Sequence, residues 1–180
     1  AEVRLRRTLQ TVAIPVFQFG MFSENDLSFF AGPNFAFGGR VLPDMARDIF
    51  AGRDIVMLSD GSPTRTFCYI TDAIAGYLKI LVRGRPAEAY NIGVETPEIS
   101  IGEVADSLVR VSSELFGYKG KVVRGVSPDK NYLVDNPNRR CPVIAKARTE
   151  LDYTPSVGLE DGIKRMMIWY GANRAEGEEK

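Results

Sequence analysis

The residues of this chain best suited to chemistry lie in one segment, LSDGSPTRTFCYITD, which covers residues 58–72. A turn over residues 60–63 presents backbone N–H groups, with the hydroxyl groups of Ser62 and Thr64 beside it. Arg65 follows, and its guanidinium group is able to bind a phosphate through two parallel hydrogen bonds. The segment therefore predicts an anion-binding site at Arg65. The alternative interpretation is a β-turn followed by a surface arginine, because exposed arginines are common.

The overall charge of the chain does not attract anions to such a site. Lys and Arg together number 23, and so do Asp and Glu, which makes the formal net charge zero. Nothing in this balance favours nucleic acid or an anionic membrane, and we expect neither as a partner. No apolar run reaches the ~18 residues that a membrane-spanning helix needs. An anion site in this chain must therefore be a local cluster of cationic side chains.

The chain has 180 residues and no histidine. This absence excludes Ser-His-Asp hydrolysis, Cys-His chemistry and the common zinc sites, and we predict no metal site. The two cysteines, Cys68 and Cys141, lack metal-binding spacing and cannot form a disulfide framework, so we expect a cytoplasmic protein. Strand alternation places Cys68 in the interior, where we expect an unreactive thiol.

The elements that must position these residues alternate between helices and short strands, which indicates an α/β protein. We expect helices over 43–51, 71–82, 100–116, 143–151 and 159–172, strands over 54–58, 64–70, 89–92 and 121–124, and a polar loop over 127–142. Ser100 and Glu103 form a capping box, and Gly117 ends that helix. We interpret Asp72 as a helix N-cap rather than a catalytic acid. The strands are too few and too short for a complete doubly wound sheet.

Four motifs resemble, in order, those of the extended short-chain dehydrogenase/reductases that act on sugar nucleotides, the NAD-dependent epimerase/dehydratase family. Residues 32–43 (GPNFAFGGRVLP) are similar to its Y-G-P … R-V-(V/L)-P, and residues 58–72 to its G-D-G-x-x-T-R-x-F-x-Y-V-x-D. Residues 90–93 (YNIG) are similar to its (Y/F)-N-(I/L)-G, and residues 135–151 (DNPNRRCPVIAKARTEL) to its D-x-P-x-R-x-P-D-(I)-x-K-A-x-x-x-L. Within the family, the nearest resemblance is to UDP-glucuronate decarboxylases and 4,6-dehydratases.

This resemblance implies the C-terminal substrate-binding lobe of a Rossmann-type enzyme, with a set of nucleotide contacts. Arg65 is implied to contact the diphosphate, and Arg139 or Arg140 to close over it; for these two the alternative is solvated loop charge. The residues implied to line the nucleotide are Val41, Leu42, Asp54, Ile55 and Val56, and a hydrogen bond from Asn91 near the ligand is as plausible as a purely local role. A UDP-sugar carries about two negative charges, which arginine–phosphate pairs would bind through charge-assisted hydrogen bonds.

Two parts of the family's machinery have no counterpart in this sequence. In the family a Rossmann glycine motif holds NAD, and in a Tyr-x-x-x-Lys pair the tyrosine removes a proton while NAD takes hydride and the lysine lowers the tyrosine pKa. None of the seven tyrosines has a lysine four residues later, and neither G-x-G-x-x-G nor G-x-x-G-x-x-G occurs. Ala31 also stands where the family has a tyrosine, so we expect a truncation, or a reading-frame or splice error, upstream of about residue 31.

These observations predict three parts: a poorly matching N-terminal remnant over 1–39, a sugar-nucleotide-binding lobe over 40–174 and a charged tail over 175–180. The function we expect is binding of a UDP- or dTDP-sugar, within an NAD-dependent decarboxylase, dehydratase or epimerase whose complete form is compatible with a homodimer. The chain as given has no catalytic residues and should be inactive alone. One alternative is a stand-alone nucleotide-sugar-binding or regulatory module, and another is a structural domain without a ligand.

We expect that this chain does not hold NAD, although the complete enzymes of the family use it. A pyrophosphate needs a glycine-rich turn between a strand and a helix N-terminus, and the sequence contains no such turn. Calorimetric titration of the chain with NAD should therefore show no binding at micromolar concentrations. A micromolar dissociation constant for NAD would contradict this expectation.

Overall fold

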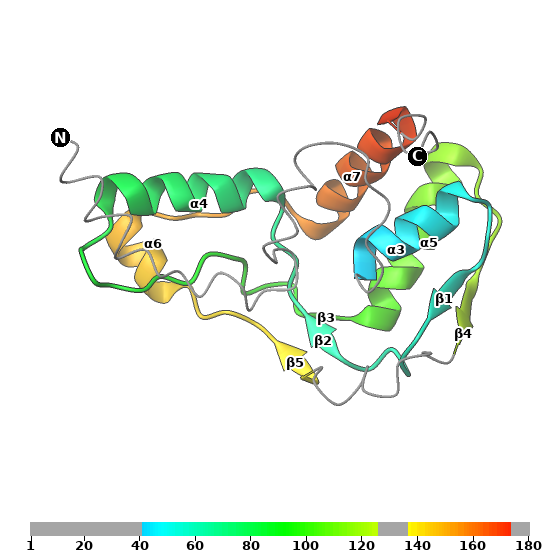
Figure 1. Ribbon diagram of the computed structural model, residues 1–180, viewed down its shortest axis with the longest axis horizontal. Coiled ribbons are helices and arrows are strands. Elements are labelled where there is room, and N and C mark those ends of the chain that lie inside the picture. The colour runs from blue at the N-terminus through cyan, green and yellow to red at the C-terminus, as the bar shows by residue number, and fades with distance from the viewer. Residues whose placement is uncertain (1–40, 126–136, 174–180) are drawn as a thin grey trace.

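The computed structural model describes residues 41–125 and 137–173, and these residues form a mixed α/β structure of the expected class (Figure 1). The interpretations of residues 1–39, 127–136 and 175–180 lie outside this range. The helices are α3 (Val41–Phe50), α4 (Ile70–Arg83), α5 (Ile101–Phe116), α6 (Ala145–Leu151) and α7 (Leu159–Asn173). The strands are β1 (Ile55–Met57), β2 (Thr64–Arg65), β3 (Ile99–Ser100), β4 (Val122–Arg124) and β5 (Arg139–Arg140).

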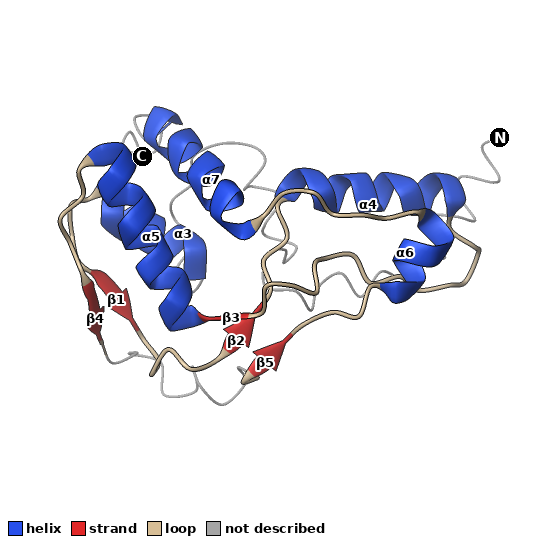
Figure 2. Cartoon of the chain, turned by 180° about the vertical axis from the view of Figure 1, so that it is seen from behind, coloured by secondary structure: helices blue, strands red, loops and turns tan. Residues whose placement is uncertain are grey.

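Helices α3, α5 and α7 pack around one hydrophobic core, seen at one end of the molecule in Figures 1 and 2. Helix α5 begins at the predicted capping box, in which the Ser100 hydroxyl accepts from the Glu103 N–H and the Glu103 carboxylate accepts from the Ser100 N–H. It ends at Gly117, which adopts the left-handed conformation at φ 67°. Helix α7 contributes an apolar stripe to this core: Ile163, Met167 and Tyr170 are buried, and Met166 packs against them.

Strands β1 and β4 form a parallel pair beside this core, with Ile55 opposite Val122. Alternation along β1 buries Ile55 completely and leaves Val56 46% exposed. Both strands agree with the sequence prediction. The pair therefore presents one face to the α3–α5–α7 core and one face to solvent.

Helices α4 and α6 enclose a second, smaller core with the segment that contains Tyr90 and Ile92. The strand predicted over 89–92 is wrong, because no described strand pairs with this segment. Its burial nevertheless alternates as in a strand: Tyr90 and Ile92 are buried, and Asn91 is exposed. The side-chain pattern was therefore interpreted correctly, but hydrogen bonds to a neighbouring strand, which define a strand, depend on what lies beside it.

A three-stranded sheet lies between the two cores, in the order β3–β2–β5 (Figure 1). Strand β2 pairs antiparallel with β3 and parallel with β5. The strand predicted over 64–70 is wrong beyond Arg65, since each partner strand supplies only two paired residues. The loop predicted over 127–142 is wrong at Arg139 and Arg140, which form β5. A two-residue strand carries too little sequence pattern to be distinguished from loop.

Asp72 joins the two cores, and its interpretation as an N-cap is wrong. The N-cap of α4 is Tyr69, which makes no side-chain capping bond. Asp72 lies in the first turn, is 7% exposed, and accepts hydrogen bonds from the Ser156 N–H (2.9 Å), the Ser156 hydroxyl (3.1 Å) and the Val157 N–H (2.9 Å). Asp72 therefore fastens the start of α4 to the loop that leads into α7.

We predict that Asp72→Ala lowers the free energy of unfolding by about 2–4 kcal/mol, because it removes a buried carboxylate that accepts from two N–H donors and a hydroxyl. Urea denaturation of the full chain would measure this loss. Glu114→Ala is the matched control, since the exposed Glu114 makes only an i,i+4 ion pair with Arg110 at 3.7 Å and should contribute less than about 0.5 kcal/mol. Equal effects of the two substitutions would contradict the role given to Asp72.

Candidate functional site

The two residues of β2 face opposite sides of the three-stranded sheet, because successive strand residues alternate. Arg65 lies opposite Arg140 of β5 and Ile99 of β3, so these three residues share one face. Thr64 lies opposite Arg139 and Ser100 on the other face. The structure therefore brings Arg65 together with Arg140, and it separates both from Arg139.

Arg65 is only 8% exposed, so it is not the surface arginine of the alternative interpretation. Its Nη1 donates a hydrogen bond of 2.7 Å to the Thr64 carbonyl. Arg140, beside it, is half-buried. Two cationic side chains thus occupy opposed positions on the same face of the ladder. The Arg65–Arg140 face of the sheet is therefore the best candidate for an anion site among the described residues.

Arg139 is engaged by a carboxylate on the opposite face. Its Nε donates to Glu98 Oε1 at 2.8 Å and its Nη2 donates to Glu98 Oε2 at 2.7 Å, a two-pronged pair. The Thr64 hydroxyl also donates to Glu98 Oε1, at 2.6 Å. The hydrogen bonds from Arg139 and Thr64 lower the pKa of Glu98. Of the two arginines predicted to close over a phosphate, Arg140 is the one that lies beside Arg65.

The turn before β2 uses its own N–H donors internally. The Asp60 carboxylate accepts from the Ser62 N–H at 3.0 Å and the Ser62 hydroxyl at 2.8 Å, and these bonds lower the pKa of Asp60. The Gly61 N–H donates to the Ser59 hydroxyl at 3.2 Å. Gly61 has a φ of +84°, and its carbonyl accepts from the Gly102 N–H at 3.0 Å, which docks the turn on α5. The expectation that this turn presents its N–H groups to an anion is therefore wrong.

The residues predicted to line a nucleotide lie around the first core. Val41 and Leu42 begin α3, are half-buried and pack against that core. Ile55 is fully buried, so its side chain belongs to the core, whereas Val56 is exposed. The Asp54 carboxylate accepts a hydrogen bond of 3.0 Å from the Lys121 N–H. Of this group, Val56 presents the most exposed apolar side chain.

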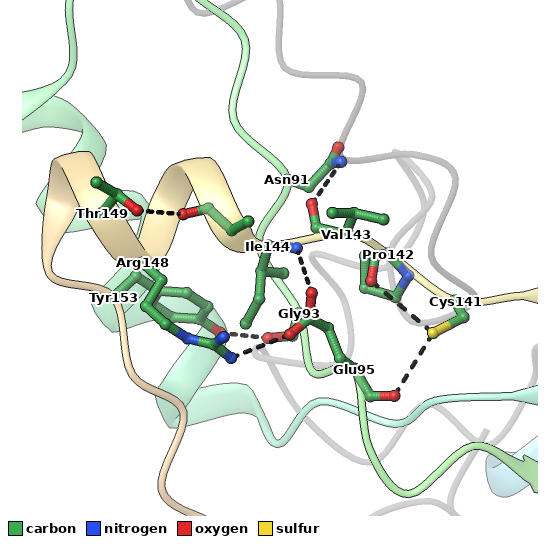
Figure 3. A network of polar contacts seen from close by, with 11 residues as sticks. Asn91, Gly93, Glu95, Cys141, Pro142, Val143, Ile144, Arg148, Thr149 and Tyr153 are labelled. Atoms are coloured by element: carbon green, nitrogen blue, oxygen red, sulfur yellow. Dashed lines mark hydrogen bonds and ion pairs between the residues drawn. The ribbon is translucent and has the colours of Figure 1, made fainter.

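Asn91 belongs to a polar network that the sequence did not reveal (Figure 3). Its Nδ2 donates to the Val143 carbonyl at 3.0 Å. The Glu95 carboxylate accepts from the Ile144 N–H at 3.1 Å and from Arg148 at 3.0 Å, and the Tyr153 hydroxyl donates to the Gly93 carbonyl at 3.1 Å. These bonds hold the segment around 91–95 against the residues that follow β5. Asn91 therefore has a local positioning role in this structure.

An apolar cavity of about 270 Å³ lies beside the site, between the segment that follows β2 and helix α7. Its lining includes Phe67, Cys68, Tyr69, Met166, Trp169 and Tyr170. Cys68 is half-buried, with its Sγ 3.5 Å from the Tyr153 hydroxyl, and burial raises the pKa of its thiol. Cys68 thus lies after β2 and is half-buried rather than interior, and its low reactivity stays a prediction.

The described tyrosines with shifted pKa values are poor proton acceptors at neutral pH. Burial raises the pKa of Tyr77 and of Tyr170 to about 12, and it also raises that of Tyr153. A tyrosine that removes a proton from a sugar needs the opposite shift. No described group of His, Cys, Asp and Glu residues is arranged to hold a metal ion. Within the described range, no helix is long and apolar enough to cross a membrane.

Comparison with known proteins assigns the fold to a class. The chain aligns with the structure of an epimerase from Methanothermobacter thermautotrophicus with a TM-score of 0.67 and 26% identity, covering 79% of this chain and 40% of that one. It aligns with the dTDP-glucose 4,6-dehydratase of Bacillus anthracis with a TM-score of 0.64 and 21% identity, covering 76% of this chain and 40% of that one. The fold is therefore that of part of a Rossmann-type epimerase or dehydratase.

Sequence comparison shows similarity to one family. Residues 26–93 match the NAD dependent epimerase/dehydratase family. The chain is 29% identical to human dTDP-D-glucose 4,6-dehydratase over 136 residues, which are 74% of this chain and 37% of the relative. It is 30% identical to the UDP-N-acetyl-alpha-D-glucosaminuronate decarboxylase of Bacillus cytotoxicus over 133 residues, 72% of this chain and 39% of the relative. The chain is thus similar to part of these enzymes, and the matched part spans about two fifths of these relatives' length.

We predict that Cys68 reacts slowly with iodoacetamide at pH 8, because a raised pKa reduces the fraction of reactive thiolate. In a Cys141→Ser variant, which leaves Cys68 as the one thiol, alkylation should be at least about tenfold slower in the folded chain than in urea. Mass spectrometry of quenched samples gives both rates. Equal rates in the folded and unfolded states would show that the fold does not protect this thiol.

Proposed function

We propose that this chain binds the diphosphate of a UDP- or dTDP-sugar, as the nucleotide-sugar-binding part of an NAD-dependent dehydratase, decarboxylase or epimerase. The observation that carries the proposal is the pairing of Arg65 with Arg140 on one face of the β2–β5 ladder. The names of the relatives supply the class of ligand, since they describe enzymes of dTDP-glucose and of UDP-linked sugar acids. The family accordingly supplies the reaction class, and the arginine pair supplies the proposed point of contact.

The physical case rests on charge. Two guanidinium groups at opposed ladder positions repel each other, and a bound dianion removes that repulsion while accepting several charge-assisted hydrogen bonds. The chain has no net charge to attract an anion from a distance. Binding must therefore come from this local pair. Arg139 does not add to it, because Glu98 already engages its guanidinium on the opposite face.

The residues of this chain do not fit NAD, and we assign them no step in hydride transfer. The sequence holds no glycine-rich turn for a pyrophosphate and no Tyr-x-x-x-Lys pair. The shifted tyrosines of the described range have raised rather than lowered pKa values. In the proposed arrangement this chain binds and orients the nucleotide, and the redox chemistry belongs to the part of the relatives that this chain does not match.

We predict that Arg140→Ala weakens UDP binding by roughly 10- to 150-fold, the loss of one charge-assisted pair of about 1.5–3 kcal/mol. Arg65→Lys should also weaken it, because an ammonium group cannot reproduce a two-pronged contact. Lysine is chosen at position 65 because Arg65 is buried, so truncation to alanine would risk the fold. Calorimetric titration with UDP would measure both effects.

Arg83→Ala provides the matched control for the loss of one positive charge. Arg83 lies at the end of α4 and makes only a long ion pair with Asp152, at 3.9 Å. Its removal should change UDP affinity by less than about twofold, since an exposed charge more than a Debye length away is screened. Unchanged affinity in Arg140→Ala and Arg65→Lys would show that the arginine pair is part of the scaffold, and the proposed function would fall.

A further inference from the structure

Glu98 spans the three-stranded sheet from one edge to the other. It precedes β3, accepts the Thr64 hydroxyl of the central strand at 2.6 Å, and holds Arg139 of β5 through bonds of 2.8 and 2.7 Å. The Arg139 side chain is 65% exposed, whereas that of Glu98 is 26% exposed. One carboxylate thus ties both outer strands to β2. We call this arrangement of Glu98, Thr64 and Arg139 the clasp.

The clasp holds together a ladder that would otherwise be weak. Strands β2 and β5 are each two residues long. Backbone bonds between the two segments run from the Thr64 N–H to the Asn138 carbonyl (2.8 Å) and from the Thr66 N–H to the Arg140 carbonyl (3.3 Å). On the face away from the clasp, Arg65 and Arg140 are like charges in opposed positions, which destabilises a pair of strands. The side-chain contacts of Glu98 on the clasp face therefore add to the few backbone bonds that hold β5 alongside β2.

We propose that Glu98 is a positioning residue for the diphosphate site: by clasping β5 to β2 it holds Arg140 beside Arg65 without touching the ligand. This inference rests on the proposed function and extends it to a residue on the other face of the sheet. Neither the sequence motifs nor the family resemblance assigns Glu98 a role. The evidence for it is the two-pronged contact with Arg139, the shared bond with Thr64 and the ladder register.

The sign of the effect separates positioning from simple electrostatics. Glu98 is an anion close to the proposed phosphate site, so by Coulomb's law alone its neutralisation should strengthen the binding of another anion. Positioning requires the opposite result. In Glu98→Gln the amide nitrogen cannot accept from Arg139, one arm of the clasp is lost, and Arg140 is no longer held beside Arg65.

The experiment is calorimetric titration of UDP into the wild-type chain, Glu98→Gln and the charge-swapped double variant Glu98→Arg/Arg139→Glu. We expect Glu98→Gln to weaken UDP binding by roughly 3- to 10-fold, the loss of about one hydrogen bond's contribution. The double variant should recover affinity to within about threefold of wild type, because it restores the cross-sheet pair at the same net charge. Unchanged or tighter binding in Glu98→Gln would overturn the proposal.

Amide hydrogen exchange without ligand tests the clasp independently of the proposed function. In Glu98→Gln the amides of Thr64 and Thr66 should exchange faster than in wild type, because both donate across the β2–β5 ladder. The Gly125 amide, which donates to the Met57 carbonyl at 2.9 Å beside the β1–β4 pair, should be unchanged. Unaltered exchange at Thr64 and Thr66 would overturn the clasp. A wild-type chain that binds no UDP would instead show that the diphosphate function itself is wrong.

Discussion

The alternation of side chains along β2 is the constraint on which the site depends. Thr64 and Arg65 are neighbours in the chain, yet they face opposite sides of the sheet and meet different partners. The same offset applies on β5, so Arg140 joins Arg65 while Arg139 joins Thr64 and Glu98. A two-residue ladder thereby separates the face of the Glu98–Arg139 pair from the face that carries Arg65 and Arg140. A register shift of one residue would place Arg139 beside Arg65 and turn Arg140 toward the face of Glu98.

The sheet keeps this register because contacts distant in sequence fix its neighbours. Asp72 joins the start of α4 to the loop before α7 across 84 and 85 residues of sequence. Glu95 and Asn91 hold the extended segment near residue 92 against the chain that leaves β5 (Figure 3). Asp72 thus ties the two cores together, and the bonds of Glu95 and Asn91 add to the apolar packing of the second core.

Local signals in the sequence predicted what depends on local physics. The Ser100–Glu103 capping box and the Gly117 helix end are set within one helical turn, and the structure confirms both. The partners of Asp72 lie 84 and 85 positions away in the sequence, and Glu98, which binds Arg139, lies 41 positions from it. The sequence therefore predicted that an arginine near 139–140 matters, but not which one lies beside Arg65. The 89–92 segment shows the same limit. Its alternating burial follows from its own sequence, whereas pairing with a neighbouring strand depends on distant residues.

The two faces of the small sheet also explain how a chain with zero net charge presents a cationic site. Pairing Arg139 with Glu98 neutralises one charge of β5 at the surface, where an ion pair adds little stability by itself. Its greater effect is geometric, since it keeps β5 alongside β2 while Arg65 and Arg140 repel each other on the other face. A buried arginine loses hydration that a bound anion then replaces with fixed hydrogen bonds. The proposed site therefore derives its affinity for a dianion from the burial and enforced proximity of two cations rather than from the charge of the whole chain.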